Sequence, residues 1–304
     1  MNSAPTLDGD IPVGNWIDRH VPAVLRPYLR LMRLDRPIGT WLLLFPCWWS
    51  IALAGDGQPD WLLMGLFAVG AVVMRGAGCT INDIADHKFD AKVERTRGRP
   101  IPSGAVTLKQ AWAFLAAQLL VGLAILVTLP PVAIALGVGS LALVFPYPLM
   151  KRITWWPQAW LGLTFNWGAL MGWAAVTGDV ALPPLLFYAA GILWTLGYDT
   201  IYAHQDKEDD ALIGVKSTAL RLAAATPRWV VGFYAGTLVL MAAAGWAADL
   251  GLAFYPLLGV AGLQLAWQVA TGDIDDSADC LEKFKSNRWF GWLVLAAILA
   301  GKVA

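Results

Sequence analysis

Two segments of the chain carry carboxylates at helical spacing. Their polar residues are Asn82, Asp83, Asp86 and Asp90 in the first segment, and Asp199, Asp206, Asp209 and Asp210 in the second. If a helix continues through each segment, Asn82, Asp86 and Asp90 share one face, and Asp199, Asp206 and Asp210 share another. Carboxylates on one face repel, and near a helix C-terminus they oppose the helix dipole by about 0.3–1 kcal/mol each. A bound cation would remove that conflict.

The ligand chemistry of these two segments favours a hard cation. Oxygen ligands suit magnesium, which proteins usually hold with a few carboxylates, substrate phosphate oxygens and water. Two such clusters facing one another would hold one ion each and bind a diphosphate between them. His87 and His204 lie inside the clusters, but single histidines among so many carboxylates suit zinc poorly. The alternative is that the acids are solvated and paired with neighbouring Lys and Arg.

Hydrogen-bond donors for a phosphate lie beside both clusters in the sequence. These residues are Lys88, Arg95, Arg99, Tyr147, Lys151, Arg152 and Lys216. Lys and Arg side chains are well suited to binding a diphosphate, and they would surround the expected metal ions. The charge bias of membrane proteins alone is an alternative explanation for many of them.

The elements that must position these residues are membrane-spanning helices. Of the 304 residues, 58% are apolar and only 14% are charged, which excludes a water-soluble globular fold. We expect an all-α membrane protein with an N-terminal arm at residues 1–30 and one nine-helix domain at residues 31–304. The expected spans are 37–54, 61–82, 110–128, 131–149, 157–177, 183–203, 228–248, 253–270 and 289–304.

The distribution of positive charge predicts the topology. Of the 22 Lys and Arg residues, 20 lie before the first span or in the loops that follow the second, fourth, sixth and eighth spans. The positive-inside rule therefore places the N-terminus and these loops in the cytoplasm. The formal net charge is zero, which gives no reason to expect a nucleic-acid partner. The first thirty residues resemble neither a secretory signal nor a transit peptide.

Several motifs resemble one known family. The stretches Asn82-Asp83-x-x-Asp86-x-x-x-Asp90 and Asp199-Thr200-x-Tyr202-Ala203-x-x-Asp206-x-x-Asp209-Asp210 resemble the two aspartate-rich motifs of the UbiA superfamily of intramembrane prenyltransferases. Further stretches resemble the bacterial type of the 4-hydroxybenzoate polyprenyltransferase branch. They are Arg33-Leu34-Asp35-Arg36-Pro37, Arg95-Thr96-x-x-Arg99-Pro100, Tyr147-Pro148-x-Met150-Lys151-Arg152 and Gly214-Val215-Lys216-Ser217-Thr218.

This resemblance implies an activity and a location. It implies nine transmembrane helices around a central cavity, two Mg²⁺ ions, a polyprenyl diphosphate donor and 4-hydroxybenzoate as acceptor. The reaction would attach the prenyl group to the ring carbon ortho to the hydroxyl, a step of ubiquinone biosynthesis, and release diphosphate. We expect the protein in the bacterial inner membrane, with its active site on the cytoplasmic side and no obligate protein partner.

The resemblance also implies roles for particular residues. Asn82, Asp86 and Asp90 would hold one magnesium ion and Asp206 and Asp210 the other, with Asp83 and Asp209 as further ligands or supporting acceptors. Asp199 would orient or deprotonate the phenol, although a metal-ligand role is the alternative. Arg33 or Arg36 would bind the carboxylate of the acceptor, although both also suit an arginine at a membrane interface. Arg75, charged within a span, would face the cavity and pair with an aspartate or contact the substrate.

Two competing functions remain open at this point. One is a related prenyltransferase with another aromatic acceptor, such as a naphthoate, homogentisate or haem. The other is a cation or proton transporter, since carboxylates within membranes often line ion pathways. A transporter would be expected to carry its acids in the middle of the spans, whereas these acids gather at one membrane face.

Overall fold

The computed structural model describes residues 7–8, 11–12, 14–94 and 96–303. These residues form two compact units. The first unit contains the described residues up to Thr40 and residues Ala68–Thr128, and the second contains Trp41–Phe67 and the described residues from Leu129 onward. The helices α3 (Ile38–Ala54) and α4 (Trp61–Asp90) continue from one unit into the other.

The first unit is built mainly from helices. Besides parts of α3 and α4 it contains β1 (Leu7–Asp8), β2 (Ile11–Pro12), α1 (Trp16–His20), α2 (Arg26–Leu31) and α5 (Leu108–Leu126). The two short strands pair in antiparallel orientation. A capping box begins α5, because Thr107 accepts a hydrogen bond from the Gln110 N–H and the Gln110 side chain accepts one from the Thr107 N–H.

The core of this unit joins α2, α4 and α5. Leu31 of α2, Ala77 and Ile84 of α4, and Ala111 and Leu115 of α5 are buried together. Ile84 directly follows Asp83, and Leu31 lies two residues before Arg33. Packing of the apolar residues therefore fixes where these two polar side chains lie.

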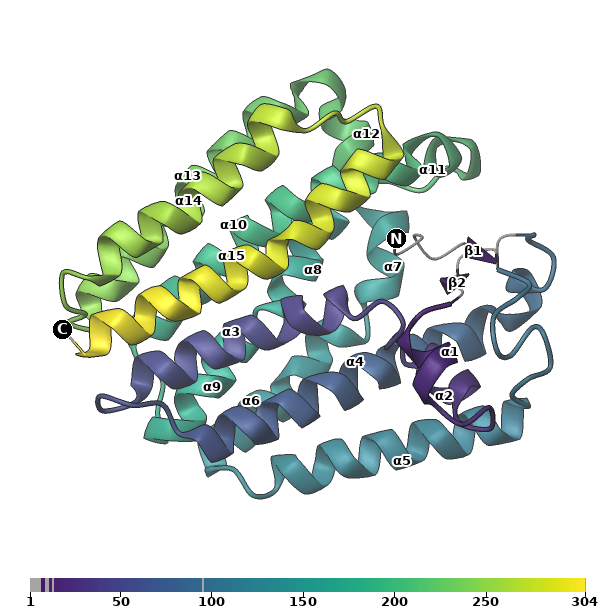
Figure 1. The fold of residues 1–304 in the computed structure, drawn as a ribbon, viewed down its shortest axis with the longest axis horizontal. Coiled ribbons are helices and arrows are strands. Elements are labelled where there is room, and N and C mark those ends of the chain that lie inside the picture. Colours follow the sequence, from purple (N-terminus) through teal and green to yellow (C-terminus); the bar gives the residue numbers. More distant parts are fainter. Residues whose placement is uncertain (1–6, 9–10, 13, 95, 304) are drawn as a thin grey trace. The chain divides into compact units, whose positions relative to one another are not determined.

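The second unit contains all the other helices. They are α6 (Pro131–Val144), α7 (Tyr147–Ile153), α8 (Pro157–Phe165), α9 (Gly168–Thr177), α10 (Leu182–Ala203), η1 (His204–Asp206), α11 (Lys207–Ile213), α12 (Thr218–Leu222), η2 (Ala223–Ala225), α13 (Thr226–Ala247), α14 (Phe254–Thr271) and α15 (Ser277–Val303). The helix α10 packs against α8, α13 and α15, and α14 lies alongside α15 (Figure 1). Asp199, the first residue of the second acidic cluster, therefore lies on a helix that several others surround.

Tryptophan residues fill the interior of the second unit. Trp49 and Trp194 are 1% and 0% exposed, with their ring centroids 5.2 Å apart. Their indole N–H groups donate to the Gly291 carbonyl and to the Asn287 Oδ1, at 2.9 and 2.8 Å. These rings belong to the core and not to an aromatic belt at the membrane interface, because protein packs around them and accepts a hydrogen bond from each indole N–H.

Helices cover every stretch that the sequence predicts to span a membrane. Among the residues that the structure describes, four helical segments are long and apolar enough to cross a bilayer by themselves, and Ile38–Ala54 is a shorter apolar helix. The four segments are Trp61–Asp90, Leu108–Leu126, Pro131–Ile153 and Thr218–Ala247. The all-α fold is confirmed.

Three helix boundaries differ from the expected ones. The fourth expected span, 131–149, ends at Val144, and Tyr147–Ile153 forms the separate helix α7. The fifth, 157–177, is divided at Asn166 into α8 and α9. The last helix begins at Ser277, twelve positions before the expected start at 289, because Asp276 accepts a hydrogen bond from the Ala278 N–H and so caps a polar first turn.

Candidate functional site

The first acidic cluster lies on one unbroken helix, as the spacing predicts. The helix α4 continues to Asp90. Asp83 and Asp90 are buried, at 1% and 4% exposure, whereas Asn82 and Asp86 are exposed. Seven positions are close to two full turns, so Asp90 lies on the face of Asp83. Asp86 and Asp90 are one helical turn apart, as expected, but Asp90 is buried whereas Asn82 and Asp86 are exposed.

Two arginines neutralise the buried acids. The Arg33 guanidinium donates to Asp83 Oδ1 at 2.7 Å, and the Arg99 guanidinium donates to Asp90 Oδ2 at 3.0 Å. Arg99 also lies 3.5 Å from Asp83 Oδ1. In contrast, Asn82 and Asp86 have no side-chain hydrogen bond or ion pair with any residue that the structure describes. The exposed pair is therefore the part of this cluster that is open to a ligand.

The backbone of Arg33 is in a strained conformation. Its φ is 59°, in the left-handed region, where a side chain costs about 1 kcal/mol relative to glycine. The chain reverses here at the end of α2, since the Arg33 N–H donates to the Arg30 carbonyl at 2.9 Å. An arginine at a position that suits glycine indicates that the guanidinium itself is required.

The neighbouring Asp35 was not among the candidates from the sequence. Its side chain is fully buried, and the Arg36 Nε lies 3.4 Å from its Oδ2. Burial raises the pKa of Asp35, while the guanidinium groups of Arg36 and Arg33 lower it. The signal that could have identified it is its place between two arginines in the motif Arg33-Leu34-Asp35-Arg36.

The other predicted residues of the first unit have different surroundings. Lys88 is exposed on α4. Arg95 lies outside the residues that the structure describes. The Arg75 guanidinium packs against Gly39, where an added methyl group would lie 2.7 Å from the Arg75 Nε. Glycine at position 39 therefore makes the space that this charged group within a span occupies.

The second acidic cluster is not on a continuous helix, which corrects the expectation from its spacing. The helix α10 ends at Ala203, the single 3₁₀ turn η1 follows, and α11 begins at Lys207. Asp199 is half-buried in the last turn of α10, while Asp206 and Asp210 bracket the first turn of α11. The reading of Asp199, Asp206 and Asp210 as one helical row is therefore wrong, because the chain changes direction between Asp199 and Asp206.

Asp206, Asp209 and Asp210 act on one another electrostatically. Burial raises the pKa of Asp210, and the negative charges of Asp206 and Asp209 raise it further. The Lys151 ammonium opposes this effect. The charge of Lys151, on α7, therefore acts on the carboxylates of α11, a grouping suited to binding both a cation and a phosphate.

Buried polar contacts hold this region in place. The hydroxyls of Thr200 and Thr218 are 2.7 Å apart and join α10 to α12. The His204 Nε2 lies 3.0 Å from the Thr226 Oγ1 and joins η1 to α13. The Lys216 N–H donates to the Lys151 carbonyl at 2.8 Å. These contacts bring the turn after α11 to the helix α7.

The predicted diphosphate donors of this unit fall into two groups. Lys151 and Arg152 are exposed in the last turn of α7, and Tyr147 is half-exposed in its first turn. The Lys216 ammonium instead donates to the Ile153 carbonyl at 3.2 Å and lies 5.8 Å from the ring centroid of Trp155. Lys216 is thus already engaged, whereas Lys151 and Arg152 point their charges to the surface.

The residues present fit a magnesium ion that is completed by its substrate. Among the described residues, no three His, Cys, Asp or Glu side chains lie close enough together to form a metal cage. Magnesium does not need one, since it is usually bound by one or two carboxylates, waters and substrate phosphates. The oxygen ligands of Asn82 with Asp86, and of Asp206 with Asp210, match that requirement.

Close relatives support an assignment of this chain. It is 53% identical to 4-hydroxybenzoate polyprenyltransferase, mitochondrial, of Arabidopsis thaliana, over 95% of this chain and 72% of the relative. The enzyme of the same name from Caenorhabditis elegans is also 53% identical, over 95% of this chain and 82% of the relative. The prediction of a bacterial inner membrane is wrong, since these close relatives are named as mitochondrial proteins.

Solved structures share the fold. A UbiA homologue from Aeropyrum pernix K1 matches with a TM-score of 0.69 and 26% identity, over 85% of this chain and 96% of that chain. A UbiA homologue from Archaeoglobus fulgidus, bound to GPP and Mg²⁺, matches with a TM-score of 0.65 and 16% identity, over 90% and 99%. Residues 43–300 match the UbiA prenyltransferase family. The chain therefore belongs to the UbiA prenyltransferase family.

Proposed function

We propose that the protein transfers a polyprenyl group from polyprenyl diphosphate to 4-hydroxybenzoate. The new bond forms at the ring carbon ortho to the hydroxyl, and diphosphate leaves, as a step of ubiquinone biosynthesis. The observation that carries this proposal is the 53% identity, over 95% of the chain, to enzymes named for this activity. Membership of a prenyltransferase family leaves the cation-transporter alternative without support.

We assign the metal ligands to side chains that are exposed or half-buried in each cluster. Asn82 and Asp86 supply oxygens for one magnesium ion, and Asp206 and Asp210 supply them for a second, with Asp209 beside them. Magnesium bound to the diphosphate would stabilise the negative charge that develops as the allylic carbon–oxygen bond breaks. The Archaeoglobus homologue bound to GPP and Mg²⁺ is consistent with this chemistry. Asp83 and Asp90 keep their arginine partners and support the site from beneath.

Side chains that carry hydrogen-bond donors are assigned to the diphosphate in this proposal. Lys151, Arg152 and Tyr147 on α7, and Lys88 on α4, are the donors with exposed or half-exposed side chains. Arg99 and Lys216 contribute only if they exchange their present partners, Asp90 and the Ile153 carbonyl, for phosphate oxygens. Arg95 belongs to the same motif as Arg99 and has the same role in this proposal.

The acceptor is bound through its two polar ends. Asp199, half-buried at the end of α10, accepts the phenol proton and so makes the ring more nucleophilic. Arg33 binds the carboxylate, with Arg36 as the competing candidate. The carboxylate would then share the Arg33 guanidinium with Asp83.

The membrane arrangement completes the proposal. Nine spans carry the N-terminus and the Lys- and Arg-rich loops on the same side of the membrane, which is also the side of the active site. The names of the relatives make a mitochondrial membrane the location that we propose.

A transfer assay tests this function. Purified protein in lipid is supplied with a polyprenyl diphosphate, magnesium and one of three acceptors: 4-hydroxybenzoate, a naphthoate or homogentisate. We expect prenylated 4-hydroxybenzoate as the main product by mass spectrometry, and its loss when EDTA is added. Equal turnover of another acceptor, or full activity in EDTA, would contradict the proposal.

The same assay tests Arg33. Arg33→Gly suits the positive φ at this position and removes the whole side chain, including the guanidinium. We expect the KM for 4-hydroxybenzoate to rise by about tenfold or more, which corresponds to the loss of a charge-assisted hydrogen bond, with a smaller change in the KM for the donor. A larger effect on the donor would reassign Arg33 to the diphosphate.

A further inference from the structure

Lys207 lies in the middle of the second acidic cluster, yet its charge is directed elsewhere. It directly follows Asp206 and begins α11. Its ammonium donates to the Ile274 carbonyl at 3.3 Å and forms an ion pair with the Asp275 carboxylate. Both acceptors belong to the loop between α14 and α15.

Without these acceptors, Lys207 would have a partner on its own helix. Asp210 lies three positions after it, which is the spacing at which opposite charges pair on a helix surface. An ammonium at Asp210 would occupy the oxygens that a magnesium ion needs. In the structure, the lysine whose charge acts on Asp210 is instead Lys151, from α7.

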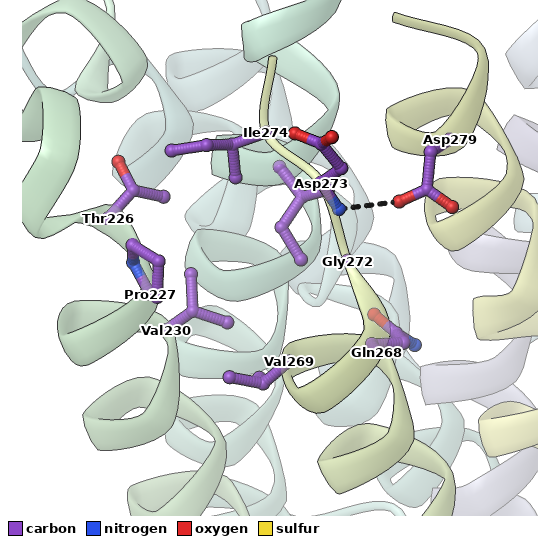
Figure 2. A pocket seen from close by; sticks show the side chains of 10 residues that line it. Thr226, Pro227, Val230, Gln268, Val269, Gly272, Asp273, Ile274 and Asp279 are labelled. Atoms are coloured by element: carbon purple, nitrogen blue, oxygen red, sulfur yellow. Dashed lines mark hydrogen bonds between the residues drawn. The ribbon is translucent and has the colours of Figure 1, made fainter. Parts of the chain in front are cut away.

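Hydrogen bonds hold the loop between α14 and α15, which contacts Lys207, in a defined conformation. The Asp275 N–H donates to Asp273 Oδ1 at 2.9 Å. The Asp273 N–H donates to Asp279 Oδ2 at 2.7 Å (Figure 2). The other oxygen of Asp279 accepts from the Lys283 ammonium at 2.7 Å. Lys283 is only 4% exposed and lies 4.4 Å from the ring centroid of Trp267. A chain of polar contacts thus connects Asp275 to the first turns of α15 and to the buried Lys283.

Polar contacts matter here because the space beneath the loop is not fully packed. A cavity of about 20 Å³, room for a single water molecule, is lined by Thr226, Val230, Val269 and Ile274 among others (Figure 2). Apolar packing alone therefore does not determine where the loop lies.

The Lys207–Asp275 ion pair contributes little to the stability of the fold. Asp275 is 79% exposed, and ion pairs at exposed positions typically contribute little to stability, since solvent screens them. What the pair changes is the location of one positive charge. Asp210 keeps its negative charge available only while Lys207 points away from it.

We propose that Asp275 is a positioning residue that holds the Lys207 ammonium away from Asp210 and so keeps this carboxylate available to magnesium. The proposal rests on the proposed role of Asp206 and Asp210 as metal ligands. It assigns a function in metal binding to a loop that follows the metal ligands by more than sixty residues.

The test compares Asp275→Asn, Lys207→Met and the double variant in the purified full-length protein. The readout is the binding of Mn²⁺, in the presence of inorganic diphosphate, followed by electron paramagnetic resonance. We expect Asp275→Asn to weaken Mn²⁺ binding by about threefold to tenfold, as expected for a residue supporting metal ligands. Lys207→Met should bind as well as the wild type or more tightly, and the double variant should resemble Lys207→Met.

Two results would overturn the proposal. One is that Lys207→Met weakens Mn²⁺ binding as much as Asp275→Asn does. That result would mean that the contact only connects the loop to α11. The other is unchanged binding in Asp275→Asn. Glu282→Gln and Lys285→Met, which remove exposed charges from α15, control for the general effect of charge.

A further variant separates this inference from the proposed function. Asp206→Ala should lose one class of Mn²⁺ site. If Asp206→Ala binds like the wild type, the metal role of this cluster fails. If Asp206→Ala loses the site while Asp275→Asn keeps it, only the role of Asp275 fails.

Discussion

Asp83 and Asp86 are three positions apart on α4, yet their surroundings differ completely. Asp83 is buried and bound by Arg33 and lies close to Arg99, whereas Asp86 is exposed. A buried carboxylate between two guanidinium groups contributes to folding, because its loss leaves positive charges without compensation. An exposed carboxylate beside Asn82 costs little to remove from the fold and is available to a ligand.

This difference predicts that substitution of Asp83 lowers the stability of the fold, whereas substitution of Asp86 affects activity and leaves the stability nearly unchanged. Asp83→Asn should lower the free energy of unfolding by about 3 kcal/mol, since breaking a buried ion pair typically costs about 3–5 kcal/mol. Asp86→Asn should change it by less than about 0.5 kcal/mol, as surface substitutions usually do. Thermal unfolding in detergent measures both variants. Equal destabilisation by the two substitutions would contradict the division of α4 into a buried and an exposed face.

The sequence predicted the acids of α4 but not this division. The spacing of Asn82, Asp86 and Asp90 indicated a helix, and the helix is present. The ion pairs could not be predicted, because Arg33 is 50 positions away from Asp83 and reaches it only through a strained turn. Asp83 and Asp90 do pair with arginines, but they are buried and not solvated as that alternative supposed.

At the scale of elements, the break between α10 and α11 decides how the second cluster is presented. A continuous helix would have placed Asp206 two turns beyond Asp199, in line with it. The 3₁₀ turn η1 instead frees Asp206 and Asp210 to follow the direction of α11. Sequence periodicity could not show this, since the contacts that stabilise the turn, such as His204 with Thr226, come from another helix.

His204 makes this turn sensitive to pH. Burial, and then the neighbouring Lys207 ammonium, lower the pKa of His204 to about 4, while Asp275 raises it. An unfolded histidine has a pKa of about 6.5, so the unfolded chain binds the proton first as the pH falls. The contribution of neutral His204 to the free energy of unfolding is therefore complete above pH 6.5. It is lost progressively between pH 6.5 and 4, by about 2 kcal/mol at pH 5.

Thermal unfolding in detergent at pH 7 and pH 5 measures this effect. His204→Gln should reduce the difference between the two pH values. Thr226→Val removes the same hydrogen bond but keeps the imidazole, so it should retain the difference. A wild-type difference that persists unchanged in His204→Gln would show that another group is responsible.

At the scale of the whole molecule, the apolar pattern predicted the helices well and their breaks poorly. Each expected span is helical, because some twenty apolar residues in a membrane must satisfy their backbone groups internally. The interruption at Asn166 was missed, since its amide group donates to the Gly162 carbonyl and to Thr195 of a different helix. The resemblance of short motifs indicated the family correctly, but it placed the protein in the wrong membrane.

The central proposal is that Asp86 of α4 and Asp206, which directly precedes α11, each belong to a magnesium site that binding of the donor diphosphate requires. The most direct test is the binding of a non-reacting prenyl thiodiphosphate to the purified protein, measured by calorimetry with magnesium and with EDTA. We predict binding that requires magnesium and that falls by about tenfold to a hundredfold in both Asp86→Asn and Asp206→Asn. Binding that is equally tight in EDTA, or unaffected by both substitutions, would contradict the account.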